Sequence, residues 1–403
     1  DPYTLGRSSA ASDVYKRQEW IKANAPVLIV FNHALERMGE YPFIANPSAD
    51  WEPLAERVDQ LAPTTGSLWD LAFNVFRYLG LFGEVGVQLF IIASGLGLML
   101  AAGRRGGVDS GFAMRRVERV APTWLVVHGL ALLASIPILV FIGGGAAELV
   151  AAPWDPRFWA SLVGFRITPE TIYYLVPAWW FIALLIQLYL AFPLIYRAFE
   201  TYGRRTLWWV MGGGVVIKLA GLLVFDAYLD TWARGAIFVT RLPEFAFGML
   251  VAVWLASDKN PMQTRRALVG GAIAIPVGIA SSLTLVGNAW GPFLFGAGLF
   301  VLLYRVLSPL NGRGRLAVGT EWVGRHSLAL FIVHQPIFHI LMPGGMAGPA
   351  RVIGGFLVAA ALTVVAALIL EWIAARVQRT WKTWAEAGVL GRRGAAIAVL
   401  CLI

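Results

Sequence analysis

The sequence predicts an all-α fold: a polytopic membrane bundle of about ten transmembrane helices, with both termini in the cytoplasm. Of its 403 residues, 58% are hydrophobic and only 14% are charged, whereas an ordinary soluble domain has roughly 25% charged residues. The charges are bunched, which leaves uncharged stretches over 85–103, 120–147, 171–196, 267–304, 326–350 and 352–370. Each stretch is long enough to cross a bilayer, because about 20 apolar residues suffice. A soluble enzyme is thereby excluded.

The spans are placed at about 21–37, 79–102, 117–142, 177–199, 206–225, 238–257, 267–286, 290–308, 324–342 and 352–376. The basic residues test this count, because Lys and Arg accumulate in cytoplasmic loops. Twenty of the 33 Lys and Arg residues fall in the loops and tail on one side, and eight fall in the opposite loops. This asymmetry predicts cytoplasmic termini. It also accounts for the net charge of +9 without nucleic acid as a partner.

Three regions follow from the same pattern. Residues 1–18 have no apolar period and end in Asp-Val-Tyr-Lys-Arg-Gln, which the end of a common sequencing adapter encodes, so we interpret them as non-native. Residues 19–376 form the transmembrane domain, and 377–403 form a basic cytoplasmic tail that we interpret as truncated. The single cysteine, Cys401, excludes disulfide frameworks and cysteine metal sites. No metal site and no bound cofactor are expected.

The most informative polar cluster is the segment 112–122, at the cytoplasmic start of the third span. Arg115 and Arg119 lie one helical turn apart, and Arg116 shares a face with Arg119. Three guanidinium groups at a membrane surface are a good site for phosphates, since each planar fork of donors meets a pair of oxygens. A positive-inside anchor or a lipid-headgroup contact explains the same residues. The residues alone leave both interpretations open.

The second feature is His33 in the first span, eleven residues after Lys22. Eleven residues bring a helical side chain back to within about 20° of the same face, about 16 Å further along. Ionisable groups inside a membrane are costly and usually face a cavity or a partner. Imidazole titrates near neutrality, so His33 is a candidate base. The alternative is a histidine that only hydrogen-bonds to a neighbouring helix.

Other candidates have equally plausible structural roles. In the second span Gly86, Phe90 and Ser94 share one face, which favours close helix packing over a substrate channel. Arg241 and Glu244 predict an ion pair at the start of the sixth span. His334 lies inside the ninth span.

Taken together, these segments resemble the acyltransferase-3 family of integral membrane O-acyltransferases. That family has a basic residue eleven positions before a histidine in its first span and a Gly-x-x-x-Phe-x-x-x-Ser-Gly run in its second. Further matches in family order are Phe112, Arg115, Arg116, Arg119 and Pro122; Trp180, Phe181, Tyr189 and Pro193; Arg241, Phe245 and Gly248; and His334 with Pro336. The resemblance covers about residues 20–376. Two departures are Lys22, where the family usually has Arg, and Leu185-Ile186, where many members have glutamates, which leaves Gln187 as the only polar neighbour.

The resemblance implies transfer of an acyl group, most often acetyl, from cytoplasmic acyl-CoA to a hydroxyl of a cell-surface or lipid-linked glycan. It implies that Arg115, Arg116 and Arg119, with Lys22, bind the donor, and that His33 is the catalytic base or a transient acyl carrier. His334, Arg241, Glu244 and Ser94 become supporting or acceptor-side candidates. Acyl-CoA is then a co-substrate, membrane lipid is a partner, and the location is the bacterial cytoplasmic membrane.

Two alternatives stay open on the sequence. One is a transporter or flippase for an anionic lipid or sugar conjugate, with the arginines as a gate and the histidines as a proton relay. Transporters of this kind usually show a repeated half, and none is evident. The other is a related acyltransferase that modifies a small molecule such as an antibiotic sugar.

Overall fold

The computed structural model describes residues 24–39, 43, 58–141, 152–256, 260–307, 315–342, 344, 346 and 348–386. All regular secondary structure within these ranges is helical. The predicted all-α class is therefore confirmed. Lys22, the stretch 1–18 and the tail beyond Glu386 lie outside the described residues.

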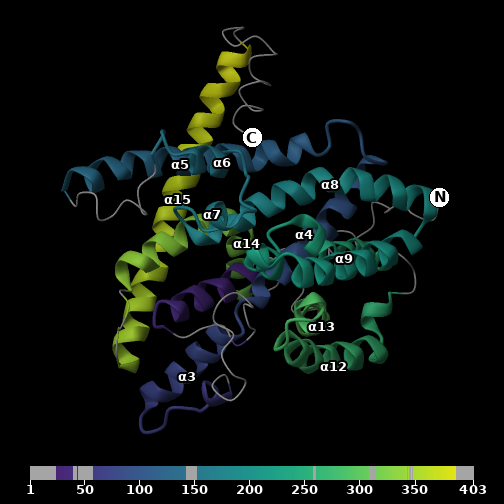
Figure 1. Ribbon diagram of the computed structural model, residues 1–403, viewed down its shortest axis with the longest axis horizontal. Helices are drawn as coiled ribbons and strands as arrows, with labels where there is room; N and C mark the ends of the chain where they lie inside the picture. Colours follow the sequence, from purple (N-terminus) through teal and green to yellow (C-terminus); the bar gives the residue numbers. More distant parts are fainter. Residues whose placement is uncertain are drawn as a thin grey trace.

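A first helix covers residues 24–36. The longer helices after it are α3 (Leu68–Leu81), α4 (Val85–Arg105), α5 (Met114–Phe141), α8 (Trp180–Tyr202), α9 (Arg205–Val224), α11 (Leu242–Leu255), α12 (Arg265–Ser282), α13 (Gly291–Leu307), α14 (Arg315–Leu341) and α15 (Pro349–Glu386). Short helices α6 (Pro156–Leu162), α7 (Pro169–Ile172) and α10 (Leu229–Arg234) lie in the connections, and 3-10 turns precede α8 (Pro177–Trp179) and α11 (Phe238–Arg241). Figure 1 shows α12 packed on α13 at one edge of the bundle and α15 at another.

Six helical segments in the described residues are long and apolar enough to cross a membrane: Val85–Arg105, Met114–Ser135, Pro177–Tyr202, Arg205–Val224, Phe238–Leu255 and Pro349–Thr380. They coincide with six of the ten predicted spans. Helices also occupy the other four positions, in residues 24–36, α12, α13 and α14, but Gly291–Val306 is shorter than a full span. The chain is thus a helical membrane protein, while the count of ten spans and the side of each terminus stay predictions.

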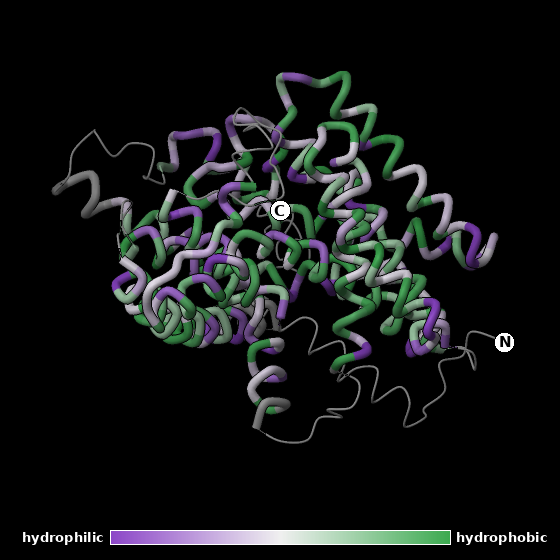
Figure 2. Tube along the Cα trace, turned by 90° about the horizontal axis from the view of Figure 1, so that it is seen from below, coloured by the Kyte–Doolittle hydropathy of each residue, from purple (hydrophilic) through white to green (hydrophobic). Residues whose placement is uncertain are grey.

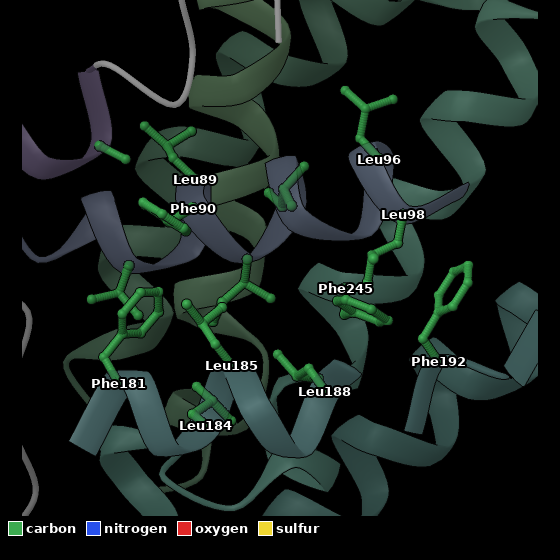
Figure 3. Packing of buried hydrophobic residues seen from close by; sticks show 14 of the residues in the cluster. Leu89, Phe90, Leu96, Leu98, Phe181, Leu184, Leu185, Leu188, Phe192 and Phe245 are labelled. Atoms are coloured by element: carbon green, nitrogen blue, oxygen red, sulfur yellow. The ribbon is translucent and has the colours of Figure 1, made fainter. Parts of the chain in front are cut away.

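Helix α4 is the centre of the bundle. Every residue from Val85 to Leu96 is buried, and the helix packs against α8, α11 and α13. In Figure 3 Phe90 and Leu98 of α4 lie toward Phe181 of α8 and Phe245 of α11, while Leu89 and Leu96 point to the other side of the helix. Leu185 is 1% exposed. The position where many family members have a glutamate is therefore filled here by apolar packing.

Two glycines allow α4 and α11 to approach closely. A Cβ atom added at Gly95 would lie 2.1 Å from the carbonyl oxygen of Phe245, and one at Gly248 would lie 2.0 Å from that of Ile92. No side chain fits such gaps, because real Cβ contacts are far longer. The hydroxyl of Ser94 donates to the carbonyl of Phe90 in its own helix at 2.8 Å. This geometry agrees with the packing interpretation of the small residues on α4.

The outside of the bundle is apolar. Exposed large hydrophobic side chains lie along α9 and α15, among them Trp209 at 79% and Val216 at 65% exposure on α9 and Leu357 at 61% on α15. Figure 2 shows hydrophobic residues along the helices and hydrophilic residues gathered at many of the turns. Such surfaces are unfavourable in water and are required in contact with lipid tails.

Candidate functional site

The central feature of the site is a contact between two histidines that are 301 residues apart. Nδ1 of His33, on the first helix, lies 2.7 Å from Nε2 of His334 on α14. The two rings are nearly parallel, at 7°, with centroids 4.9 Å apart. His334 is fully buried, whereas His33 keeps part of its surface accessible. The structure therefore brings together two of the residues singled out from the sequence.

The hydrogen bonds of His334 fix the role of each nitrogen. Nδ1 of His334 lies 2.7 Å from the carbonyl oxygen of Phe331, and a carbonyl can only accept, so this nitrogen carries the proton. Nε2 of neutral His334 is then an acceptor, and Nδ1 of His33 donates to it. The lone pair of neutral His33 is consequently on Nε2. Among the described residues Nε2 of His33 has no hydrogen-bond partner, and an oriented imidazole with an available Nε2 is the arrangement that a general base requires.

Pro336 leaves one carbonyl of α14 without its helical hydrogen bond, and a neighbouring segment binds there instead. A proline in a helix has no N–H to donate to the carbonyl four residues earlier, which is that of Ile332. The indole of Trp179 donates to this carbonyl instead, at 3.0 Å. Beside it, Oε1 of Gln335 accepts the backbone N–H of Ala178 at 2.7 Å. The turn that begins α8 is thus fastened to the segment that carries His334.

A second polar region, here called the basic segment, consists of Arg105, Phe112, Arg115, Arg116 and Arg119. The Arg105 and Arg116 guanidinium groups lie 5.8 and 5.6 Å from the centre of the Phe112 ring. Arg116 and Arg119 also act electrostatically on Tyr189 of α8. Arg115 forms an ion pair of 2.5 Å with Asp109. The hydrogen bond from Arg115 lowers the pKa of the Asp109 carboxyl.

The two regions lie at opposite ends of α4. Arg105 is its last residue, and its 21 residues make it about 30 Å long. At the other end, the first helix crosses the α3–α4 junction in the antiparallel direction. Cβ atoms added at Gly86, Gly83 and Gly80 would meet, in turn, the carbonyl oxygens of Ala25, Leu28 and Phe31. His33 therefore lies near the start of α4, far from the basic segment.

The predicted ion pair of Arg241 and Glu244 is present. Nη1 of Arg241 lies 3.0 Å from Oε1 of Glu244, and both side chains are almost fully buried. Arg241 also donates to the carbonyl of Arg234, at the end of α10. The pair thus fastens α10 to the start of α11, as a structural role requires. Ser94 lies in the middle of α4 and contacts neither histidine in the hydrogen bonds described.

The structure adds interactions of three residues that were not predicted from the sequence. Arg105 joins the basic segment through Phe112, and Arg116 and Arg119 act electrostatically on Tyr189. Gln187 binds the loop before α11, because its Nε2 donates to the carbonyl of Ala236 and its Oε1 accepts from the N–H of Phe238, both at 3.1 Å. In the sequence, the one indication for Tyr189 was its place in the family match of the fourth span, four residues before Pro193.

Comparison with known proteins supplies the remaining evidence. The sequence profile described as an acyltransferase domain matches residues 17–375, which is nearly the whole chain. No curated protein and no solved structure matches the sequence significantly. The matched region contains both histidines, the basic segment and the Arg241–Glu244 pair. On this match over almost its full length, the chain belongs to the acyltransferase-3 family.

Proposed function

We propose that this protein transfers an acyl group, most simply acetyl, from acyl-CoA to a hydroxyl of a cell-surface or lipid-linked glycan. The observation that carries the proposal is the hydrogen bond between His33 and His334, within a chain of the acyltransferase-3 family. In this proposal Nε2 of His33, whose Nδ1 is held by His334, acts as the base. The same proposal places the chain in the bacterial cytoplasmic membrane, with the basic segment on the cytoplasmic face and His33 toward the opposite face.

The separation of the two regions favours a donor with a long arm. Arginine side chains suit phosphate oxygens, because a planar guanidinium can donate two parallel hydrogen bonds. Arg116 and Arg119 would hold the phosphates of acyl-CoA, and the pantetheine arm would carry the thioester past Tyr189 toward His33. A short donor such as an acyl phosphate would not extend along most of α4, which is about 30 Å long. Lys22, eleven residues before His33, would orient the donor.

In the first version of the chemical step the acyl group passes from CoA to the acceptor without an intermediate on the protein. Nε2 of His33 takes the proton of the acceptor hydroxyl, and the oxygen attacks the thioester carbonyl carbon. The C–S bond breaks as the C–O ester bond forms, and the thiolate of CoA receives the proton from His33. In the second version of the step Nε2 of His33 attacks the thioester carbonyl carbon, and the C–S bond breaks to release the thiolate of CoA. The acceptor hydroxyl then attacks the acyl-imidazole, the C–N bond breaks, and the hydroxyl proton passes to the thiolate. His334 is a positioning residue in both versions, because it holds the ring of His33 through Nδ1.

The experiment that tests the proposal is acyl transfer by the purified chain in lipid vesicles. Radiolabelled acetyl-CoA is supplied with a panel of glycan acceptors, and the ester product is counted. We expect Arg116→Gln and Arg119→Gln each to raise the KM for acetyl-CoA about tenfold, the scale of losing a charge-assisted hydrogen bond. Arg204→Gln is the control, since Arg204 is an exposed arginine of another loop. An unchanged KM in both variants would contradict the donor assignment.

Substitution of Asp109 is expected to strengthen donor binding, whereas the arginine substitutions weaken it. Arg115 lowers the pKa of the Asp109 carboxyl through its hydrogen bond, and in this ion pair Asp109 competes with a donor phosphate for Arg115. Asp109→Asn removes this competitor, so we expect the Kd for acyl-CoA to fall by up to about fivefold, the range of exposed ion pairs. The measurement is isothermal titration of CoA into the solubilised protein at low and high salt. Weaker binding by the variant would show that Asp109 helps the donor.

A further inference from the structure

Arg166 is a buried cation between α6 and α7, and its hydrogen-bond acceptors in the described part of the chain are all neutral. The residue is 0% exposed. Its Nη1 donates to the hydroxyl of Ser161 in α6 at 2.8 Å. Its Nη2 donates to three backbone carbonyls, those of Ile172 at 3.3 Å, Val176 at 3.1 Å and Tyr174. A planar fork of donors meets acceptors on two sides at once, which a flexible ammonium does not reproduce.

Two of these carbonyls belong to the neighbours of a strained residue. Leu175 has a φ of 60°, and it is the one non-glycine residue with a positive φ among those the structure describes. The N–H of Val176 donates to the carbonyl of Tyr174 at 2.8 Å, which closes a three-residue γ-turn around Leu175. A leucine persists in this conformation only where surrounding contacts hold it. Arg166 binds the carbonyls of the residues on both sides of Leu175 and so stabilises the γ-turn.

Arg166 is itself anchored to α5 through Ser161. Nδ1 of His128 lies 2.9 Å from the carbonyl oxygen of Trp124, so this nitrogen carries the proton and Nε2 of the neutral imidazole is an acceptor. The hydroxyl of Ser161 lies 3.0 Å from that Nε2. Ser161 therefore donates to His128 and accepts from Arg166, and all three side chains are buried. The position of the guanidinium is fixed from the α5 side.

The γ-turn leads directly to a tryptophan that contacts both sides of this region. Trp179 follows Leu175 by four residues and is 1% exposed. Its ring lies 6.0 Å from the guanidinium carbon of Arg166 and 5.0 Å from the ring of His128. Its indole N–H donates to the carbonyl of Ile332 in α14. Trp179 thus joins the Arg166 region to α14.

The contacts of this segment with α14 lie on either side of His334. Ile332 precedes His334 by two residues, and Gln335, which accepts the N–H of Ala178, follows it directly. The carbonyl of Phe331, next to Ile332 in the chain, accepts the proton on Nδ1 of His334 at 2.7 Å. A shift of the turn before α8 therefore moves the part of α14 that orients this imidazole.

We propose that Arg166 acts through Trp179 as a positioning residue for the histidine pair. The guanidinium holds the γ-turn, and the γ-turn places the indole against α14. The indole in turn fixes the part of α14 that directs Nε2 of His334 toward Nδ1 of His33. That this pair serves acyl transfer rests on the proposed function, whereas the effect of Arg166 on the contact between the two rings does not.

The test is magic-angle-spinning NMR on the full chain in lipid vesicles, with isotope-labelled nitrogen only in its five histidines. The hydrogen bond between Nδ1 of His33 and Nε2 of His334 gives a nitrogen–nitrogen correlation between two different histidines. We expect it in the wild-type chain. Trp179→Phe keeps a ring but loses the N–H, and Arg166→Lys keeps the charge but loses the fork of donors. We expect each to weaken the correlation at least about twofold.

Trp159→Phe is the matched control for Trp179→Phe. The indole of Trp159 also donates to a backbone carbonyl, that of Pro153 at 2.7 Å. Trp159 lies on α6 and is 49% exposed, and its bonded carbonyl is not part of α14. The same substitution here removes an equivalent hydrogen bond, so this variant must retain the correlation.

Arg305→Lys is the matched control for Arg166→Lys. Arg305 on α13 also donates to a backbone carbonyl, that of Gln263 at 2.9 Å, and its variant must retain the correlation. Gel filtration and thermal unfolding identify variants that fail to fold. If Arg166→Lys is among them, Trp179→Phe decides.

A double variant tests whether Arg166 acts through Trp179. If it does, adding Arg166→Lys to Trp179→Phe weakens the correlation little further, whereas independent effects would multiply. In the acyl-transfer assay each single variant should lower kcat about fivefold, the scale of one lost hydrogen bond. The KM for acetyl-CoA should not change, because the basic segment lies at the other end of α4.

Four results would overturn the inference. The wild-type chain gives no correlation between the two histidines, the correlation survives in both folded variants, the effects of the two substitutions multiply, or ester formation keeps its wild-type kcat in both. Failure of the proposed function looks different. In that case the correlation still depends on Arg166 and Trp179, while no ester forms from acetyl-CoA even with the wild-type chain.

Discussion

Replacement of His33 by alanine is expected to lower the kcat of acyl transfer by about 10²–10⁴, the contribution of a positioned general base. The Kd for CoA should stay unchanged, because the basic segment lies at the other end of α4. The measurement is ester formation from radiolabelled acetyl-CoA, with CoA binding determined in parallel. A His33→Ala variant with wild-type kcat would exclude both the base and the acyl-carrier role.

Two variants of His334 test whether this residue positions His33 or only fills space beside it. His334→Leu leaves Nδ1–H of His33 without its acceptor, and the loss of one hydrogen bond corresponds to about a tenfold fall in kcat. His334→Gln provides an amide oxygen that accepts the same proton, so we expect it to recover much of the lost rate at an unchanged KM for the donor. Equal activity in the Leu and Gln variants would show that the contact between the rings has no catalytic consequence.

The second large effect is expected at the crossing of α4 and α11. Gly248→Ala places a methyl group 2.0 Å from the carbonyl oxygen of Ile92, so the two helices must separate. Overpacking of a core typically costs about 1–3 kcal/mol, and here backbone rather than a flexible side chain is in the way. Gly95→Ala meets the carbonyl of Phe245 from the opposite helix and should behave alike. We expect both variants to lose most of the monodisperse protein in gel filtration.

Gly213→Ala is the control for this prediction. Gly213 lies on α9, and a Cβ atom there meets nothing within 4 Å. Because alanine favours helix over glycine by up to about 1 kcal/mol, this variant should be as stable as the wild type or more so. If Gly248→Ala unfolds at the same temperature as Gly213→Ala, the close approach of α4 and α11 is not required.

Features that depend on local spacing could be predicted from the sequence. Scarcity of charge predicted a helical membrane protein, since a bilayer leaves few other folds available. The Arg241–Glu244 pair is three residues apart on one helix, so its geometry follows from helical periodicity and is present in the structure. Arg116 and Phe112 lie one turn apart and also meet. The family resemblance, carried by short motifs in order, is confirmed by the profile match.

Features that depend on contacts between distant segments could not be predicted. Nothing in the sequence pairs His33 with His334, because 301 residues separate them. Helical periodicity relates residues within one helix only and gives no contact between two helices. The hydrogen bond from Trp179 to the carbonyl of Ile332 likewise joins segments that are 153 residues apart.

The sequence by itself determined the helical membrane class, the candidate base and the candidate phosphate ligands, because composition and helical spacing are local properties. Tertiary structure alone decided that His334 contacts His33 and that the basic segment and His33 lie at opposite ends of α4. The physical reason is that a hydrogen bond or a charge interaction needs its groups within a few ångströms. Packing, with glycines that let α4 approach its neighbours, sets which distant groups come that close.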